Sequence, residues 1–177
     1  FVTSIFYVAG RLKDGLKSEA VIVWGVLPLM AVTLAIASYL RNEVWRDPLV
    51  MWSDVVKKSP QRAEPHHNLG IELSKLKRHD DAIEEYGKAI QLDPSNQRFH
   101  TSMGITLSEM SRPAEAFLHY REALRLNPDD EKVHLNLANL LAVSGGLEDA
   151  LYHYKEALRL KPDYNKAHRN LGRVLEY

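Results

Sequence analysis

Residues 63–96 read AEPHHNLGIELSKLKRHDDAIEEYGKAIQLDPSN, and this stretch decides the fold because its pattern returns at intervals of 34 residues. The interval separates prolines at Pro60, Pro94, Pro128 and Pro162, and histidines at His66, His100, His134 and His168. Three further columns keep it, namely Ala82, Ala116 and Ala150, then Tyr86, Tyr120 and Tyr154, then Ala89, Ala123 and Ala157. Such a period is typical of a stacked repeat array, which offers a binding surface more than a catalytic pocket.

Each period predicts two amphipathic helices. With the proline placed at position 32, the repeats are 63–96, 97–130 and 131–164, and a partial fourth covers 165–177. Bulky apolar residues recur at positions 7 and 11, namely Leu69, Met103, Leu137 and Leu171, then Leu73, Leu107, Leu141 and Leu175. Spacings of 3, 4 and 7 residues are helical. Each proline should end a second helix, because proline cannot continue one.

Small residues recur where the two helices of a repeat should cross. They occupy position 8 as Gly70, Gly104, Ala138 and Gly172, and the tyrosine column occupies position 24. A residue with little or no side chain lets two backbones approach closely, and we expect the ring to fill the space beside it. Turns between the helices are expected at 77–80, 111–113 and 144–146.

This pattern resembles the tetratricopeptide repeat (TPR) family, whose unit is a helix–turn–helix of 34 residues. The matching pieces read HNLGIEL…DAIEEYGKAIQLDP, HTSMGITL…EAFLHYREALRLNP and HLNLANLL…DALYHYKEALRLKP. The resemblance covers about residues 63–177. It implies an all-α solenoid of about three and a half to four repeats that binds proteins or extended peptides.

The segment before the repeats predicts a membrane anchor. Residues 20–40, AVIVWGVLPLMAVTLAIASYL, carry no charge over 21 positions, and a helix of about this length can cross a bilayer. We therefore expect residues 20–40 to contact membrane lipid. Residues 1–19 read as the end of a preceding apolar segment plus a short loop. The loop carries three basic residues, which favours the loop as cytoplasmic. We therefore expect an integral membrane protein with its repeats outside the cytoplasm, in a periplasm or lumen.

Residues 41–62 predict a connector followed by half a repeat. Asp47 and Pro48 suit a helix start, and a helix should run to about Lys58, before Pro60. In repeat register, Trp52 falls at the ring position. The helix is therefore expected to cover the apolar end of the first repeat, as solenoids require.

Composition excludes several function classes. The 23 basic and 23 acidic residues balance, so no basic footprint for nucleic acid is present. There is no cysteine, no glycine-rich phosphate loop and no nucleophile motif, so we assign no catalytic residue, cofactor or metal. The histidine column could suggest a metal site, but equivalent positions of stacked repeats lie roughly 10 Å apart. Its members are expected to be half-buried rings between helices.

The TPR resemblance places a peptide site on the concave face, which the first helices line. Position 6 reads Asn68, Ser102, Asn136 and Asn170, similar to the asparagine ladder of O-GlcNAc transferase, whose amides hold a peptide backbone. The predicted site adds Asn139, Lys132, Arg98 and Arg169, which make the face somewhat basic. The alternative is that these asparagines are merely solvated. A two-carboxylate clamp is not favoured, because His67 and Ile71 stand where that clamp has Lys and Asn.

Three functions remain open at this point. The first is a membrane-anchored TPR module for protein or peptide partners. The second is the substrate-presenting part of a multi-span membrane glycosyltransferase, since the junction RNEVWRDPLVMWSDVVKKSP…HHNLG resembles that of the transmembrane and TPR-containing O-mannosyltransferase family. That family's catalytic acids lie in earlier loops, so whether the parent is an enzyme stays open. The third is a structural role in assembling membrane machinery.

Overall fold

The computed structural model describes residues 27–176, except for the side chains of residues 40–44. The chain divides into two compact units, Phe1–Asp47 and Pro48–Tyr177. Every regular element in the described part of the chain is an α-helix.

The first unit contributes one described helix, α2 (Leu27–Arg46), and here a prediction is wrong. Within residues 27–176, no helix combines the length and the apolar character that a bilayer crossing needs. The last six residues of α2 include two arginines and a glutamate, so the apolar part of this helix ends at Leu40. Residues 20–26 of the expected span lie outside the described residues. The predicted localisation, an integral membrane protein with extracytoplasmic repeats, is corrected by this finding.

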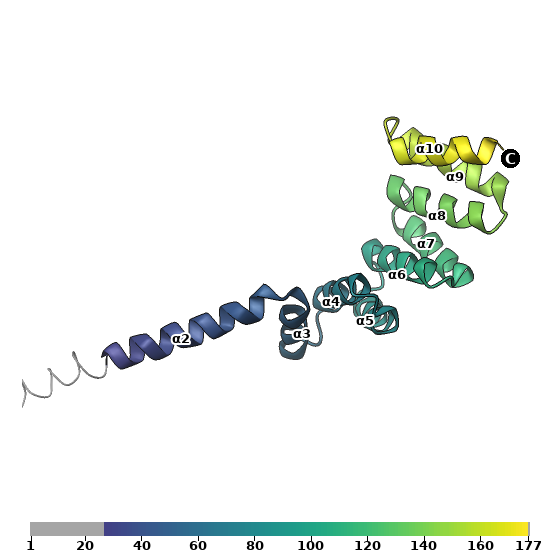
Figure 1. Cartoon of the computed structure of the whole chain (residues 1–177). Coiled ribbons are helices and arrows are strands. Elements are labelled where there is room, and N and C mark those ends of the chain that lie inside the picture. Colours follow the sequence, from purple (N-terminus) through teal and green to yellow (C-terminus); the bar gives the residue numbers. More distant parts are fainter. Residues whose placement is uncertain (1–26, 177) are drawn as a thin grey trace, which may run out of the picture. The chain divides into compact units, whose positions relative to one another are not determined.

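The second unit is a stack of helical hairpins (Figure 1). Its helices are α3 (Pro48–Lys58), α4 (Ala63–Lys75), α5 (His79–Leu92), α6 (Gln97–Glu109), α7 (Pro113–Leu126), α8 (Glu131–Val143), α9 (Leu147–Leu160) and α10 (Asn165–Leu175). The pairs α4–α5, α6–α7 and α8–α9 each form one hairpin, and α10 is the first helix of a further one. All second helices end two residues before a proline of the 34-residue column, as predicted.

Close helix crossings build the core. A Cβ built on Gly70 would lie 2.6 Å from Cε1 of Tyr86, and one on Gly104 would lie 2.7 Å from Cε1 of Tyr120. Both tyrosines are almost fully buried. The expected pairing of a small residue with a ring is therefore confirmed, and it fixes how closely the two helices of a repeat approach.

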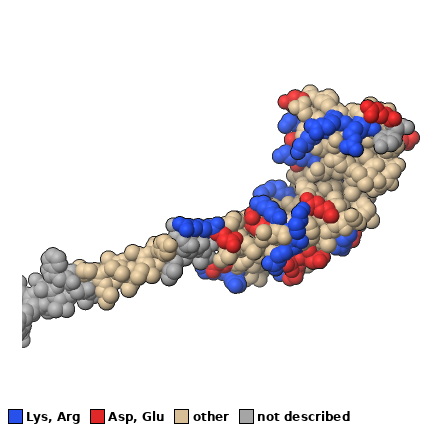
Figure 2. All heavy atoms as spheres, viewed as in Figure 1, with Lys and Arg blue, Asp and Glu red and all other residues tan. Residues whose placement is uncertain are grey.

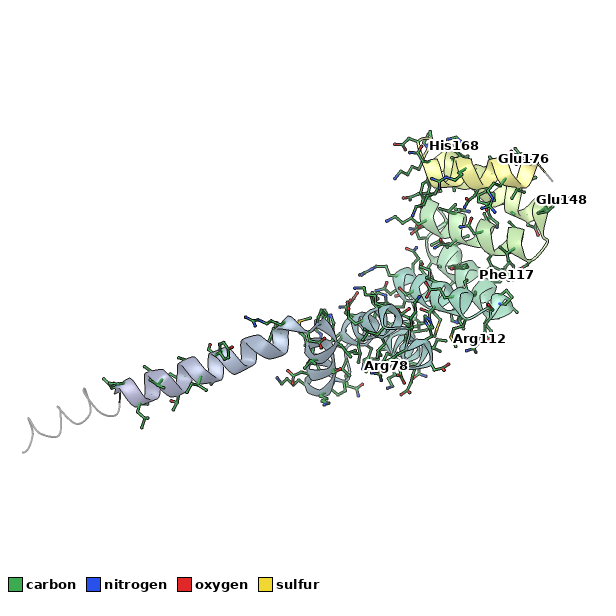
Figure 3. All side chains as sticks on the ribbon, viewed as in Figure 1. Arg78, Arg112, Phe117, Glu148, His168 and Glu176 are labelled. Carbon is green, nitrogen blue, oxygen red and sulfur yellow. The ribbon has the colours of Figure 1, made fainter. Side chains whose placement is uncertain are left out.

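The turns inside the hairpins repeat one backbone conformation. Lys77, Ser111 and Gly145 are equivalent residues, and all three have positive φ, at 61°, 57° and 86°. The next amide in each turn donates to the carbonyl five residues earlier, as in Arg78 N to Leu73 O at 3.0 Å. This is the Schellman arrangement that ends many helices. In Figure 3, Arg78 and a second labelled arginine mark the starts of α5 and α7.

Helix α3 covers one end of the stack. Leu49, Trp52 and Val56 are partly buried and pack against the core that continues through the repeats. The helix runs from Pro48 to Lys58, as the sequence predicts. Trp52 thus packs in the first unpaired helix at the position that tyrosine takes in the three full repeats.

Candidate functional site

The first helices of successive repeats form the inner face of the stack. Helices α4, α6, α8 and α10 contact one another in order, whereas the second helices of successive repeats, α5, α7 and α9, make no contacts with each other. Side chains also bond between neighbouring first helices. Ser74 Oγ lies 3.1 Å from Thr106 Oγ1, on α4 and α6. Because the first helices lie closer together than the second helices, their exposed side is the concave side.

The predicted asparagine column lies on these helices, and its members differ in their bonding. All four, Asn68, Ser102, Asn136 and Asn170, are half-buried. Ser102 Oγ lies 2.9 Å from His67 Nε2. Burial, followed by the charge of Arg98, lowers the pKa of His67 to about 4, so this ring is neutral near pH 7. Asn68 and Asn136 are partly exposed and make no side-chain hydrogen bond with any described residue.

Asn139 and Asn170 are locked together at the C-terminal end of the face. Asn139 Oδ1 accepts from the Tyr154 hydroxyl at 2.7 Å and from Asn170 Nδ2 at 2.7 Å. This leaves the Asn139 amide hydrogens and the Asn170 carbonyl oxygen without a bonded partner among the described residues. The bonded pair therefore keeps one donor group and one acceptor available, which are the two groups that a peptide unit can bond to.

These two amides line a hollow of about 500 Å³ between α8 and α10. Its wall is largely apolar, with Val143, Leu147 and Val174 among its residues, and Arg173 stands at its edge. A smaller hollow of about 250 Å³ occupies the equivalent place between α4 and α6. Its residues include Ile71 and Ser102, so the inner face is hollowed at two points, two repeats apart.

The predicted cations of the site divide into two groups. Arg98 pairs with Glu64 across neighbouring first helices, at 3.5 Å between Nη1 and Oε1. Lys132 and Arg169 are exposed and have no ion pair with any described residue. The structure thus brings Lys132 and Arg169 to the half of the face that holds the larger hollow.

The histidine column has a contact that the sequence analysis missed. Nε2 of His134 lies 3.0 Å from the carbonyl oxygen of Pro128, and His66 and His168 make the same contact with the preceding proline. A carbonyl only accepts, so Nε2 donates. The constant spacing of six residues between proline and histidine is the signal that could have shown this.

Two of these histidines face a second histidine on the next helix. His134 Nδ1 lies 2.9 Å from His153 Nδ1, and His100 Nδ1 lies 3.2 Å from His119 Nδ1. Because His134 already donates through Nε2, its neutral ring accepts at Nδ1 and His153 donates. A hydrogen bond therefore joins the two rings, in place of a shared metal ion. Among the described residues, no group of three or more His, Cys, Asp or Glu could hold a metal ion.

Two family models match the chain. The tetratricopeptide repeat model covers residues 63–96, and a TPR repeat model covers residues 143–176. The chain therefore carries TPR repeats, and the described fold is a TPR helix–turn–helix solenoid. A comparison with curated proteins found no match.

Solved structures of the same fold are similar to this chain. The first TPR of Spaghetti (RPAP3), bound to the HSP90 peptide SRMEEVD, has a TM-score of 0.64 and 24% identity, over 66% of this chain and 92% of that one. A crystal structure of MamA has a TM-score of 0.68 and 21% identity, over 72% and 75% of the two chains. The first TPR domain of human RPAP3 has a TM-score of 0.63 and 24% identity, over 66% and 92%. At these identities the likeness shows the fold alone.

Proposed function

We propose that this chain binds extended segments of partner proteins along its concave face, and that it holds their main chain through asparagine amides. The observation that carries the proposal is the pair of unbonded amides at Asn68 and Asn136 together with the fixed pair of Asn139 and Asn170. A similar structure, the first TPR of Spaghetti (RPAP3), is bound to a peptide. That likeness supports the class of ligand, and the residues of this face supply the chemistry.

The spacing of the amides suits an extended chain. Asn68 and Asn136 are two repeats apart, which is roughly 20 Å if successive first helices lie about 10 Å apart. An extended peptide rises about 3.3 Å per residue, so about six residues would bridge the two amides. Each asparagine can donate to a carbonyl and accept from an amide of the peptide. Such contacts involve only the main chain of the peptide, so binding should depend little on the partner's side chains at these two points.

One hydroxyl of the inner face does lie beside a possible base, because Ser102 Oγ is 2.9 Å from His67 Nε2. A catalytic histidine is normally oriented by a third group at its other ring nitrogen, whereas Nδ1 of His67 is buried without a hydrogen-bond partner among the described residues. The proposal is therefore one of binding, with no reaction assigned to this chain.

The test begins with a peptide library displayed on phage and selected on the full 177-residue chain. The tightest peptide is then measured against a variant with Asn68→Ala and Asn136→Ala, and against Gln91→Ala as a control. Gln91 is an exposed amide on a second helix, α5. We expect the double variant to bind at least about thirtyfold more weakly, since each of the two asparagines loses at least one hydrogen bond of about 1 kcal/mol. The control should bind like the parent chain.

A chemical change in the peptide sharpens this test. Replacing one backbone amide of the peptide by an ester removes a donor without changing any side chain. Esters scanned along the peptide should weaken binding to the parent chain at some positions, and that loss should shrink in the double asparagine variant. Equal binding by the double variant, with no ester effect at any position, would rule out main-chain recognition by these asparagines.

A further inference from the structure

Free cations gather at one end of the concave face. Elsewhere in the repeats, most Lys and Arg side chains have a partner. Ion pairs engage Lys75, Lys77, Arg78, Lys88, Arg98, Arg112, Arg125 and Arg159. Arg121 and Lys161 lie over aromatic rings. Exposed cations of the repeats without an ion pair or ring contact to any described residue are Lys155 on the second helix α9 and four on the first helices α8 and α10, namely Lys132, Lys166, Arg169 and Arg173. Figure 2 shows blue spheres gathered over α10.

These cations share a helix side with the fixed amides. On α8, Lys132, Asn136 and Asn139 follow at spacings of four and three residues, which places them along one side of the helix. On α10 the same spacing joins Lys166, Asn170 and Arg173. The hydrogen bond between Asn139 and Asn170 shows that these two sides meet. Arg173 therefore lines the larger hollow, and Lys132 and Lys166 lie about two turns and about one turn before Asn139 and Asn170 on the same helix sides.

The size of that hollow follows from three substitutions between repeats. In the smaller hollow, Ser74 bonds to Thr106 across the gap between α4 and α6, at 3.1 Å. At the equivalent places of the larger hollow stand Ala142 and Val174, which cannot form such a bond. Gly145 also replaces the lysine that lines the smaller one. The outcome is a wider, more apolar hollow beside a donor–acceptor pair, on helices that carry four cations without an ion pair to any described residue.

We infer that this end of the face binds an acidic segment of a partner protein that carries one bulky apolar side chain. The inference rests on the proposed function and names its preferred partner. The apolar side chain enters the hollow between α8 and α10, and the main chain beside it bonds to Asn139 and Asn170. Asp or Glu residues on either side of it lie near Lys132, Lys166 and Arg169. An apolar hollow among the cations fits a peptide better than a nucleic acid, whose phosphates would leave that hollow unfilled.

The probes are synthetic peptides of about nine residues, all labelled with fluorescein, acetylated and of equal length. One has leucine at its centre between glutamates, a second has alanine in place of the leucine, and a third has glutamines in place of the glutamates. Anisotropy is measured with the full chain at about 50 mM and about 500 mM salt. We expect the first peptide to bind about tenfold more tightly than either of the others at low salt, and its advantage over the glutamine peptide to shrink at high salt.

Matched variants locate the effect on the chain. Lys166→Glu with Arg169→Glu should weaken binding of the leucine–glutamate peptide at least about tenfold and should not change binding of the glutamine peptide as much. Lys155→Glu is the control, because Lys155 is an exposed, unpaired cation on a second helix, α9. Ala142→Phe should fill the hollow and abolish the preference for leucine over alanine, with the preference for glutamate kept. Circular dichroism verifies that each variant is folded.

Two results would overturn the inference. The first is equal binding of all three peptides, with loss only in the asparagine variants. In that case the proposed main-chain recognition stands and the acidic partner class does not. The second is equally tight binding of a single-stranded oligonucleotide or of anionic lipid vesicles that competes with the peptide and is unaffected by Ala142→Phe. That result would show a general anion surface and no peptide site.

Discussion

Tyr86 lies against Gly70 so closely that a Cβ at position 70 would stand 2.6 Å from the Cε1 of its ring. This contact sets the separation of α4 and α5, and the same contact recurs between Gly104 and Tyr120. The helix separation within each hairpin determines where the first helices stand. The inner face, with its amides and hollows, therefore depends on these crossings.

Gly70→Ala should destabilise the solenoid. The added methyl group forces the buried ring or the helices to shift, and overpacking of this kind costs about 1–3 kcal/mol of the free energy of unfolding. Gly87→Ala is the control, because a Cβ at Gly87 meets nothing within 4 Å, and alanine is favoured over glycine in a helix by about 1 kcal/mol. Urea unfolding followed by circular dichroism measures both. A stable Gly70→Ala variant would contradict the proposed role of the contact.

Ser111→Gly should stabilise the chain. Ser111 has φ of 57°, a left-handed conformation that costs a residue with a Cβ about 1–2 kcal/mol. Glycine avoids that cost and loses part of the gain through its greater freedom in the unfolded state, so we expect a net gain of about 0.5–1 kcal/mol. The reverse change in the equivalent turn, Gly145→Ala, should cost a similar amount. A lower urea midpoint for Ser111→Gly would show that the serine side chain stabilises this turn in some other way.

Asp130→Ala should destabilise the third repeat through the loss of a helix cap. The Asp130 carboxylate accepts from the amides of Lys132 and Val133, at 2.9 and 3.0 Å. Removing a cap of this type costs about 1 kcal/mol. Asp129→Ala is the control, since Asp129 is exposed and has only a long ion pair, of 3.4 Å, to Arg159. Thermal unfolding should show a clear loss for the first variant and almost none for the second.

Stability should fall in mild acid because of the histidine pairs. Burial lowers the pKa of His119 and of His153, and the facing histidine lowers each further. Nearby carboxylates, such as Glu115 beside His119, oppose the shift without cancelling it. In the unfolded chain a histidine takes up a proton near pH 6.5, at about its ordinary pKa, whereas the folded rings resist it. Stability is therefore fully present above about pH 6.5 and declines as the pH falls below it.

Variants separate the histidines from the carboxylates. His119→Asn with His153→Asn should reduce the loss of stability between about pH 6.5 and pH 5, where the carboxylates of the folded chain are still charged, and the part of the loss that is due to His67 should remain. The measurement is the urea midpoint at several pH values for the parent and the double variant. If both lose the same stability over this range, the pairs do not cause it. His67, with a pKa of about 4, would then be the first of the remaining groups to test.

Much of the fold could be predicted from the sequence because repetition multiplies a weak signal. One glycine or proline is ambiguous, but Gly70 and Gly104 at the same position, each against a tyrosine sixteen residues later, indicate a helix crossing. The predicted span over residues 20–40 had no such repetition behind it, and apolar composition alone misled. Within the described residues, α2 instead continues into the charged residues that follow Leu40.

The site could be predicted by position but not by bonding. The column of Asn68, Ser102, Asn136 and Asn170 does lie on the inner helices. Which of these amides are free depends on partners in the neighbouring repeat, such as Asn139 for Asn170. Such partners are set by side-chain rotamers and helix separation, which a spacing pattern does not contain. The hollow beside Asn139 also depends on polar or long side chains that are absent at Ala142, Gly145 and Val174, and a pattern of apolar positions does not reveal that.

The most direct measurement of the central claim follows the side-chain amides of asparagine by NMR as peptide is added. The chain is labelled with nitrogen-15, the amide pairs are assigned by mutation, and the tightest library peptide is titrated. We expect large shifts for the side-chain amides of Asn68 and Asn136 and none for Gln91 on α5. Shifts confined to second-helix residues such as Gln91, with the inner asparagines unmoved, would contradict it.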